Sequence, residues 1–347
     1  MNRPGIARPP RSPANMVTWQ AQLNWERFGA TAPWVLMFVF LAASALMIWR
    51  LEALGRKGFE GTVLGTVIMP YCSGVGNLVF AFIVGRERGA SSDVFVNCLV
   101  NNVTNLTLLI GLPAVFWGAA VFGKKKRLAR TAAQTEQINR LSLLLTLTAG
   151  LFFLGAVWAL SRDGRLTFND GLVLVGLFLF WQVYHVFEVM KGNVRQNRAL
   201  PWSIVYELLL LLVGALAVYW SVNALVQWLD AAELGWVKRE HRGWLSGWLM
   251  VLPNAILAMY YGWRHRPEVV YASQVGDGHI CLPLCLGIYA LMTPAKVPAI
   301  LDLSVQVLAG TLIVHWLLVL IFGRLPRLAG GLLLVGYGVF LWKGLPT

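Results

Sequence analysis

Four asparagines lie within a strongly apolar stretch of this 347-residue chain. The run FVNCLVNNVTNLTLLIG, residues 95–111, contains Asn97, Asn101, Asn102 and Asn105. On a helix, a spacing of four residues places Asn97, Asn101 and Asn105 on one face, with Asn102 about 100° away. Such a stripe forms either a hydrogen-bonded contact between helices or a polar pathway, since amide oxygens are ligands for hard cations. We favour the pathway.

The composition places this stretch in a membrane. Hydrophobic residues make up 57% of the chain and charged residues 13%, against about 25% charged in soluble domains. Long apolar runs predict an all-α polytopic membrane protein, because backbone groups in lipid must be bonded within each segment. The ten expected spans are 33–50, 62–84, 93–122, 141–161, 170–190, 203–228, 244–263, 268–293, 299–322 and 326–343.

The spans divide into two sets of five with similar lengths. An odd number of helices per half brings the second half into the membrane from the opposite side, which is inverted-repeat geometry. We expect an N-terminal tail over 1–32, a first repeat over 33–190, a linker over 191–202 and a second repeat over 203–347. The tail is rich in Pro and Arg, and Met16 is an alternative start.

Each half contains a proline in the middle of an expected span. Pro70 and Pro253 each remove one helix hydrogen bond, and in lipid the freed carbonyls need protein, water or an ion as partners. Each proline helix is followed by a short basic loop and then by a helix rich in amides or glycines. The alternative is a packing kink, which two matched prolines make the weaker explanation.

Few ionisable residues lie at membrane depth. Asp277 and His279 occur in GDGH of the second half, where Asp277 is a candidate ion or proton site or an interhelical hydrogen-bonding group. We expect His185 and Glu188 to form an internal ion pair. We expect the remaining ionisable residues at depth to be isolated, namely Glu207, Asp302 and His315.

These segments resemble the cation/calcium exchanger superfamily, typified by sodium/calcium exchangers. GTVIMPY (65–71) and VLPNAILA (251–258) are similar to its two Pro-Glu helices. VNCLVNNVTNLTLLIGL (96–112) and ASQVGDGHICLPLCLG (272–287) are similar to the helices that follow, with Ser273 or Gln274 at the first amide position of the second. The resemblance covers the ten-span layout and two stretches of about 45 residues, and it implies alternating access.

The chain differs from the family pattern at the residues that carry charge. Tyr71 and Asn254 stand where the resemblance implies carboxylates, and Leu282 or Cys281 stands at a late acidic or amide position. Calcium sites need several oxygens with negative charge, so these differences argue against calcium. The candidate ion-pathway residues are Asn97, Asn101, Asn105, Tyr71, Asn254, Ser273, Gln274 and Asp277.

We therefore expect a secondary transporter, a cation antiporter that moves a monovalent cation, a proton or another undetermined cation. The alternative is a transport-inactive scaffold or sensor of the same fold. An intramembrane enzyme is the weakest hypothesis, because HExxH, GxSxG and phosphate-binding motifs are absent from the sequence. No cofactor is expected beyond a bound cation such as sodium.

The expected partners are the lipid bilayer and small inorganic cations or protons. The net charge of +13 is spread over membrane-flanking loops, where anionic lipid is a simpler partner than nucleic acid. With the tail omitted, the distribution of Lys and Arg places both termini outside a bacterial inner (plasma) membrane. The four cysteines all lie within spans, so a disulfide framework is not expected and we interpret them as buried small hydrophobes.

Overall fold

The computed structural model describes residues 29, 31–56, 69–87, 91–118, 130–196, 202–231, 233–323 and 325–346, and these are almost entirely helical. The helical elements are α1 (Ala32–Arg56), α3 (Met69–Arg86), α4 (Asp93–Val103), the π-helix η3 (Thr104–Leu108), α5 (Leu109–Trp117), α6 (Arg130–Leu160), α7 (Phe168–Gln196), α8 (Ser203–Ala231), the 3₁₀ turn η4 (Arg239–His241), α9 (Arg242–Trp263), α10 (Pro267–His279), the π-helix η5 (Ile280–Cys285), α11 (Leu286–Met292), α12 (Leu301–Phe322) and α13 (Arg327–Gly344).

The predicted all-α class is confirmed, and each of the ten expected spans overlaps a helix. Two spans continue through a π turn, so that α4, η3 and α5 form one rod, as do α10, η5 and α11. Several predictions lie wholly or partly outside the described residues. These are the tail up to residue 28, Met16, residues 62–68 of the second span, 119–122 of the third, and 197–201 of the linker.

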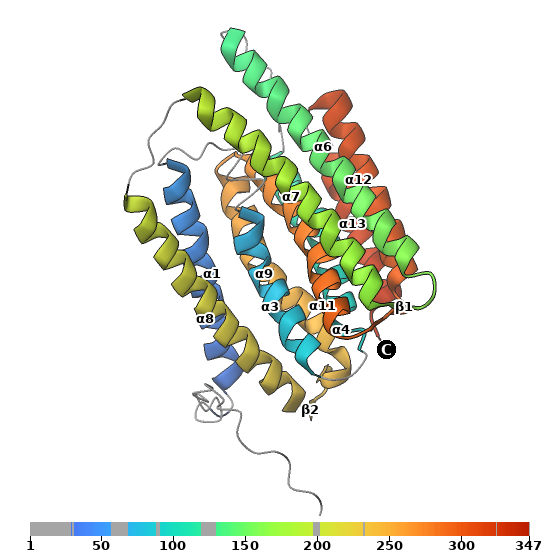
Figure 1. Cartoon of the computed structure of the whole chain (residues 1–347). Coiled ribbons are helices and arrows are strands. Elements are labelled where there is room, and N and C mark those ends of the chain that lie inside the picture. Colours follow the sequence, from blue (N-terminus) through green and yellow to red (C-terminus); the bar gives the residue numbers. More distant parts are fainter. Residues whose placement is uncertain are drawn as a thin grey trace, which may run out of the picture.

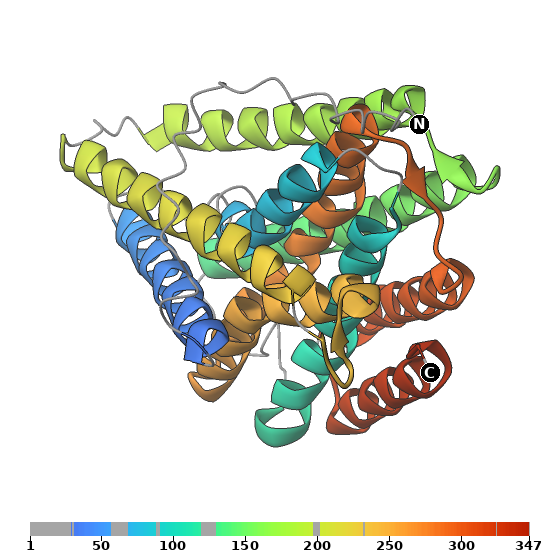
Figure 2. The same cartoon turned by 90° about the horizontal axis from the view of Figure 1, so that it is seen from below.

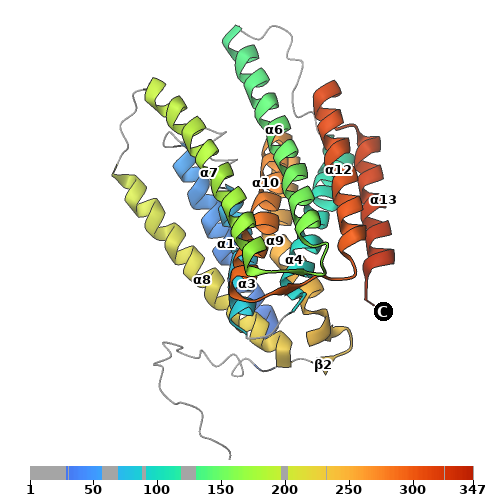
Figure 3. The ribbon, with the colours of Figure 1, turned by 45° about the vertical axis from the view of Figure 1, so that its right-hand side comes forward.

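The helices form a bundle with a central group and two flanks. α1 and α8 lie side by side on one flank, and α12 and α13 lie on the other (Figure 1). α3, the α4 rod, α9 and the α10 rod pass through the centre between them (Figure 2). α6 and α7 cross obliquely over one side of this group (Figure 3). The helices that carry the amides are therefore enclosed by the others.

Two short strand pairs connect the ends of helices. β1 (Arg165–Leu166) pairs antiparallel with β4 (Ala295–Lys296), which joins the α6–α7 connection to the α11–α12 connection. β2 (Glu233–Leu234) and β3 (Val237–Lys238) form an antiparallel hairpin between α8 and α9. Both pairs tie the same end of the bundle together without entering it.

The outer surface of the described residues is far more apolar than that of a soluble protein. Large apolar side chains cover the outside, including Phe180 at 75% exposed and Leu328 at 78%. The interior instead holds a group of buried amides and hydroxyls. An exposed apolar surface of this extent fits hydrocarbon rather than water. Six helices among the described residues are long and apolar enough to cross a membrane.

Close helix crossings occur where both partners are small. Gly171 of α7 lies against Gly287 of α11, and a Cβ at Gly171 would come within 2.8 Å of the Gly287 carbonyl oxygen and 3.0 Å of the Leu291 nitrogen. Both neighbours are backbone atoms that cannot rotate away. Gly176, on the same helix, has open space where its Cβ would lie.

We expect Gly171→Ala to lower the stability of the purified protein by about 1–3 kcal/mol, because the added methyl forces α7 and α11 apart. The matched control Gly176→Ala adds the same methyl without a contact and should be neutral or slightly stabilising, since alanine favours helix. Tryptophan fluorescence during heating in detergent measures both. Equal melting temperatures for the two variants would contradict the close crossing.

Candidate functional site

Asn105 joins the two halves of the chain at the centre of the bundle. It lies in η3 and is completely buried. Its Nδ2 donates to Asp277 Oδ2 of α10 at 2.7 Å and to Asn101 Oδ1 of α4 at 2.9 Å. Its Oδ1 accepts a hydrogen bond from Asn254 Nδ2 of α9 at 3.4 Å. Each polar atom of this side chain is therefore used in a contact, and two of the three contacts reach the second half of the chain.

The hydrogen-bond network continues from Asn101 to α3. Asn101 Nδ2 donates to Asn77 Oδ1 at 3.3 Å. Cys281 Sγ of η5 lies 3.8 Å from Asn101 Oδ1 and 3.8 Å from Asp277 Oδ2. All four side chains are buried, and Asp277 is the one carboxylate among the described residues of this network. Sequence reasoning missed Asn77, whose only signal was a single amide at the seventh position after Pro70.

The two remaining asparagines of the opening run have different surroundings. Asn97 Nδ2 donates to Ser246 Oγ of α9 at 3.1 Å, and Ser246 was not predicted as a site residue. Asn102 Nδ2 donates to the Cys98 carbonyl at 2.6 Å. Its Oδ1 faces α10 so closely that a Cβ at Gly278 would lie 2.6 Å away. A side chain at position 278 would require the Asn102 amide to move.

The polar residues of the second half complete the cluster. Ser273 Oγ donates to the Val270 carbonyl at 3.0 Å. Gln274 Nε2 donates to Ser273 Oγ at 3.0 Å and to the Asn254 carbonyl at 3.4 Å. Four buried amide oxygens have no hydrogen-bond partner among the described residues: Asn97 Oδ1, Asn102 Oδ1, Asn254 Oδ1 and Gln274 Oε1. Such atoms are costly in a dry interior, so four of them on three neighbouring helices call for a functional explanation.

Both amide-bearing rods widen into a π turn at corresponding places. η3 begins one residue before Asn105, and η5 begins one residue before Cys281. Counting back by fours from these residues gives Asn101 and Asn97 in the first rod, and Asp277 and Ser273 in the second. The shared spacing favours Ser273 over Gln274 as the counterpart of Asn97. Single π turns inside α-helices are frequent at functional sites.

The two π turns have different local surroundings. In η5, Pro283 supplies no N–H to the preceding turn, so the regular α pattern cannot continue. In η3, two threonine hydroxyls bond to backbone carbonyls of the preceding turn. Thr104 Oγ1 donates to the Val100 carbonyl at 2.7 Å, and Thr107 Oγ1 donates to the Val103 carbonyl at 2.5 Å.

The structure adds detail to the GDGH segment and to the two prolines. α10 stays helical through both glycines of GDGH and through His279, and it widens only after His279. His279 points away from Asp277 to α6, where its Nε2 contacts the Thr146 carbonyl at 2.9 Å, because residues two apart lie on opposite helix faces. Pro253 lies inside α9 as expected, whereas Pro70 is the second residue of the described α3.

Two of the three residues expected to be isolated at depth, Glu207 and His315, have partners. Glu207 of α8 forms an ion pair with Arg50 of α1 at 3.4 Å, and His315 of α12 is hydrogen-bonded through both ring nitrogens. The partners of Glu207 and His315 lie far away along the chain, so the helical periodicity of the sequence does not indicate these contacts. The side chains of Tyr71, His185 and Glu188 lie outside the described residues.

A buried arginine closes one end of the space between α4 and α9. Arg242, whose side chain is 3% exposed, bonds to Asp93 at 2.7 Å, Glu87 at 2.8 Å and Asp230 at 3.1 Å. The three carboxylates come from the start of α4, the residue after α3 and the end of α8. Burial of a charge requires such pairing, and here it fixes four helix ends to one another.

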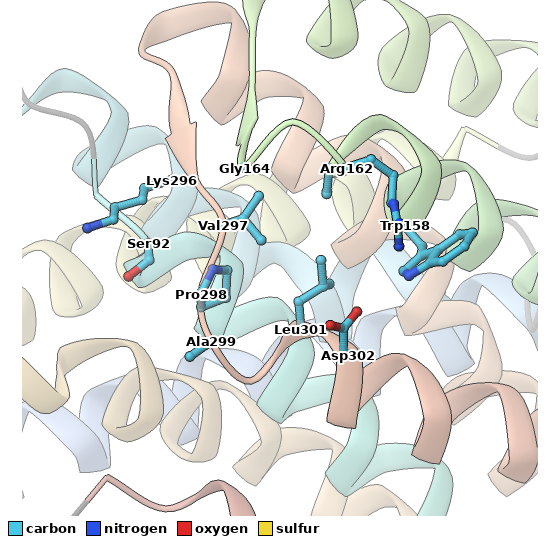
Figure 4. Close-up of a pocket in the computed structure, with 11 residues that line it drawn as sticks. Ser92, Trp158, Arg162, Gly164, Lys296, Val297, Pro298, Ala299, Leu301 and Asp302 are labelled. Carbon is cyan, nitrogen blue, oxygen red and sulfur yellow. The ribbon is translucent and has the colours of Figure 1, made fainter.

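A separate pocket lies at the same end of the bundle and shares no residue with the amide cluster. Its volume is about 660 Å³, and Figure 4 shows Arg162 and Trp158 at the end of α6, with Asp302 at the start of α12. The Arg162 guanidinium carbon lies 4.9 Å from the centre of the Trp158 ring. The end of α6 and the start of α12, which line this pocket, are separated along the chain from Asn105 and Asp277.

The described residues contain no group of three or more His, Cys, Asp or Glu side chains that could hold a metal ion. The amide cluster is a different kind of site, with several neutral oxygens around one carboxylate. Oxygen ligands of this kind suit hard cations. A buried polar site between interrupted helices of an apolar bundle is typical of secondary transporters.

The chain belongs to the sodium/calcium exchanger protein family. The family profile, described as sodium/calcium exchanger protein, matches residues 32–187 and 206–343, which is more than half of the chain. The chain is accordingly an integral multi-pass membrane protein and a cation antiporter, and the exchanged ion is left open. No curated relative matches the chain in sequence.

Solved structures of the sodium-calcium exchanger NCX_Mj have a similar fold. The form soaked with 100 mM Na⁺ and 10 mM Sr²⁺ aligns with a TM-score of 0.67 at 17% identity, covering 91% of this chain and 98% of that chain. The form soaked with zero Na⁺ and Ca²⁺ gives 0.66 at 17% identity, covering 90% and 98%. At this identity the similarity shows the fold alone.

The contact between Asn105 and Asp277 can be tested by exchanging the two side chains. Asn105→Asp places two carboxyl groups together, so we expect a lower melting temperature, because both cannot ionise at this distance. Adding Asp277→Asn should restore most of the loss, since the amide then donates in the opposite direction. We expect a coupling energy of roughly 1–3 kcal/mol from thermal melts of the four proteins. Purely additive losses would mean that the two side chains are not in contact.

Proposed function

We propose that the amide cluster around Asn105 and Asp277 is the exchange site, and that it carries a monovalent cation such as Na⁺. The observation that supports this most directly is the set of four buried amide oxygens, from Asn97, Asn102, Asn254 and Gln274, that have no hydrogen-bond partner among the described residues. Dehydrating a small cation requires several oxygens in exchange for its waters, and these oxygens belong to α4, α9 and α10.

The charge of the cluster supports a single positive charge. Asp277 is its one carboxylate within the described residues, and Asn254 stands where the family resemblance implies a second acid. In a medium of low dielectric constant, one negative charge offsets a monovalent ion but leaves a divalent ion with an uncompensated charge. We therefore propose that calcium is not the main substrate of this chain.

A proton is the second candidate substrate. Asp277 is completely buried and already accepts a hydrogen bond from Asn105. A carboxyl group in this position could carry a proton across the cycle while the amides remain neutral. This variant of the proposal uses the same residue and predicts flux that depends on a pH gradient rather than on Na⁺.

The fold suggests how the site is reached from either side. Residues 33–190 and 203–347 are proposed as the two inverted repeats, with 1–32 as a tail and 191–202 as a linker. Asn105 and Asp277 come from different repeats, so relative movement of the repeats would change their contact. At one end, Gly243 and Gly247 of α9 pack against Val96 and Val100 of α4, which closes the space between these helices in this conformation. We place the protein in a bacterial inner membrane, with both termini outside.

Asp277→Asn should abolish cation-dependent flux, because the site loses its one carboxylate among the described residues while keeping its volume. Purified protein in liposomes is tested for ²²Na⁺ uptake and for change of internal pH, each with an imposed gradient of the other ion. Asp302→Asn, the same chemical change at an exposed residue outside the cluster, is the matched control and should transport normally.

The result can be read in three ways. Full flux in Asp277→Asn would remove the site assignment. Thermal stabilisation by Ca²⁺ at concentrations where Na⁺ has no effect would reverse the charge argument, since any ligand of the folded state stabilises it. Absence of flux and of stabilisation with Na⁺, K⁺, Ca²⁺, Mg²⁺ and pH would favour the alternative, a transport-inactive scaffold or sensor.

A further inference from the structure

A buried histidine outside the amide cluster holds the π turn that carries Asn105. His315 lies in α12 and is completely buried. Its Nε2 lies 2.9 Å from the carbonyl oxygen of Leu106, the residue after Asn105. Its Nδ1 lies 2.9 Å from the hydroxyl of Tyr271, a buried residue of α10 six positions before Asp277. The histidine therefore connects the two rods that supply the cluster.

The chemistry of the partners fixes the direction of both hydrogen bonds. A carbonyl oxygen can only accept, so Nε2 carries the proton in the bond to Leu106. In the neutral ring Nδ1 then accepts, and the Tyr271 hydroxyl must donate to it. Tyr271 thus selects the ring tautomer that can bond to η3. The two rings meet edge to face, with centroids 5.2 Å apart, which also fixes the plane of the imidazole.

A donor to Leu106 matters because a π turn leaves backbone carbonyls without regular helical partners. Two side-chain donors come from within η3, where the hydroxyls of Thr104 and Thr107 donate to the carbonyls of Val100 and Val103. The Val100 carbonyl also accepts the backbone N–H of Thr104. The third side-chain donor is His315, the one of the three that belongs to another helix. In an apolar interior a carbonyl without a donor is costly, so loss of this bond should favour a regular α turn. A change in the turn would rotate Asn105 away from Asp277.

We propose that His315 and Tyr271 are positioning residues that set the conformation of η3, and through it the affinity of the Asn105–Asp277 site for its cation. Neither side chain is hydrogen-bonded to the cluster among the described residues, and both act through the backbone at Leu106. The effect on cation affinity rests on the proposed function, whereas the effect on η3 does not.

His315→Leu and His315→Gln separate this role from simple packing. Leucine fills the space without a donor, whereas glutamine can donate to Leu106 and accept from Tyr271. Two quantities are measured for each purified protein: amide hydrogen exchange of peptides covering 104–110, and the NaCl concentration at half of the Na⁺-dependent rise in melting temperature. We expect His315→Leu to raise both by about three- to thirtyfold, the equivalent of losing ~0.6–2 kcal/mol at 1.4 kcal/mol per factor of ten. His315→Gln should remain close to wild type.

Tyr271→Phe removes only one hydroxyl. It tests the role of the His315–Tyr271 pair at η3 if His315→Leu cannot be purified. It should shift both quantities in the same direction by a smaller factor, because the tautomer is no longer held. Tyr260→Phe, the same change at a half-exposed tyrosine of α9, is the control and should change neither.

The inference is overturned if His315→Leu and His315→Gln behave alike, or if Tyr271→Phe leaves exchange at 104–110 unchanged. A fall in melting temperature without a change in either quantity would indicate packing only and would also overturn it. If the wild type shows no Na⁺ dependence but the exchange contrast persists, the sodium site fails while the role of His315 at η3 stands.

Discussion

The structure depends on one constraint: a carboxamide buried among hydrocarbon needs hydrogen-bond partners that the protein itself supplies. Asn105 meets this constraint through Asn101, Asn254 and Asp277, and so brings α4, α9 and α10 to a common point. Because the hydrogen-bonding groups of Asn105 are all used, rotation of any of these helices breaks a bond with no water to replace it. The helices around them supply the apolar surroundings that make this network costly to break.

The two rods reach the same geometry by different local means. A proline imposes the π turn in η5, whereas threonine hydroxyls and the imidazole of His315 support it in η3. This difference explains why the sequences of the two halves look dissimilar at the point where their structures agree. The fold requires a π turn next to the polar residues that are spaced four positions apart, and several residue types can provide such a turn.

The family fold bears on the architecture of this chain, whereas the chemistry of its central side chains bears on the ion. Membership of the sodium/calcium exchanger family and the similarity to NCX_Mj establish the architecture. In our proposal the ion is selected by the side chains at the centre, where Asp277 is the one carboxylate of the amide cluster among the described residues. The Arg242 cluster, with three carboxylates around one guanidinium, concentrates acidic charge at the end of the bundle instead. Fold and charge therefore have to be considered separately in such a divergent member.

The sequence by itself determined the features that depend on neighbouring residues along the chain: the apolar spans, and the single face shared by Asn97, Asn101 and Asn105. Helical period and hydrophobicity are local, so they can be read from one chain. Only the tertiary structure decided that Asn105 meets Asp277, that Asn77 and Ser246 join the cluster, and that His279 faces α6 while His315 bonds to η3. These contacts join residues that are 24 to 209 positions apart. They depend on how helices rotate against one another, which no periodicity along one helix specifies.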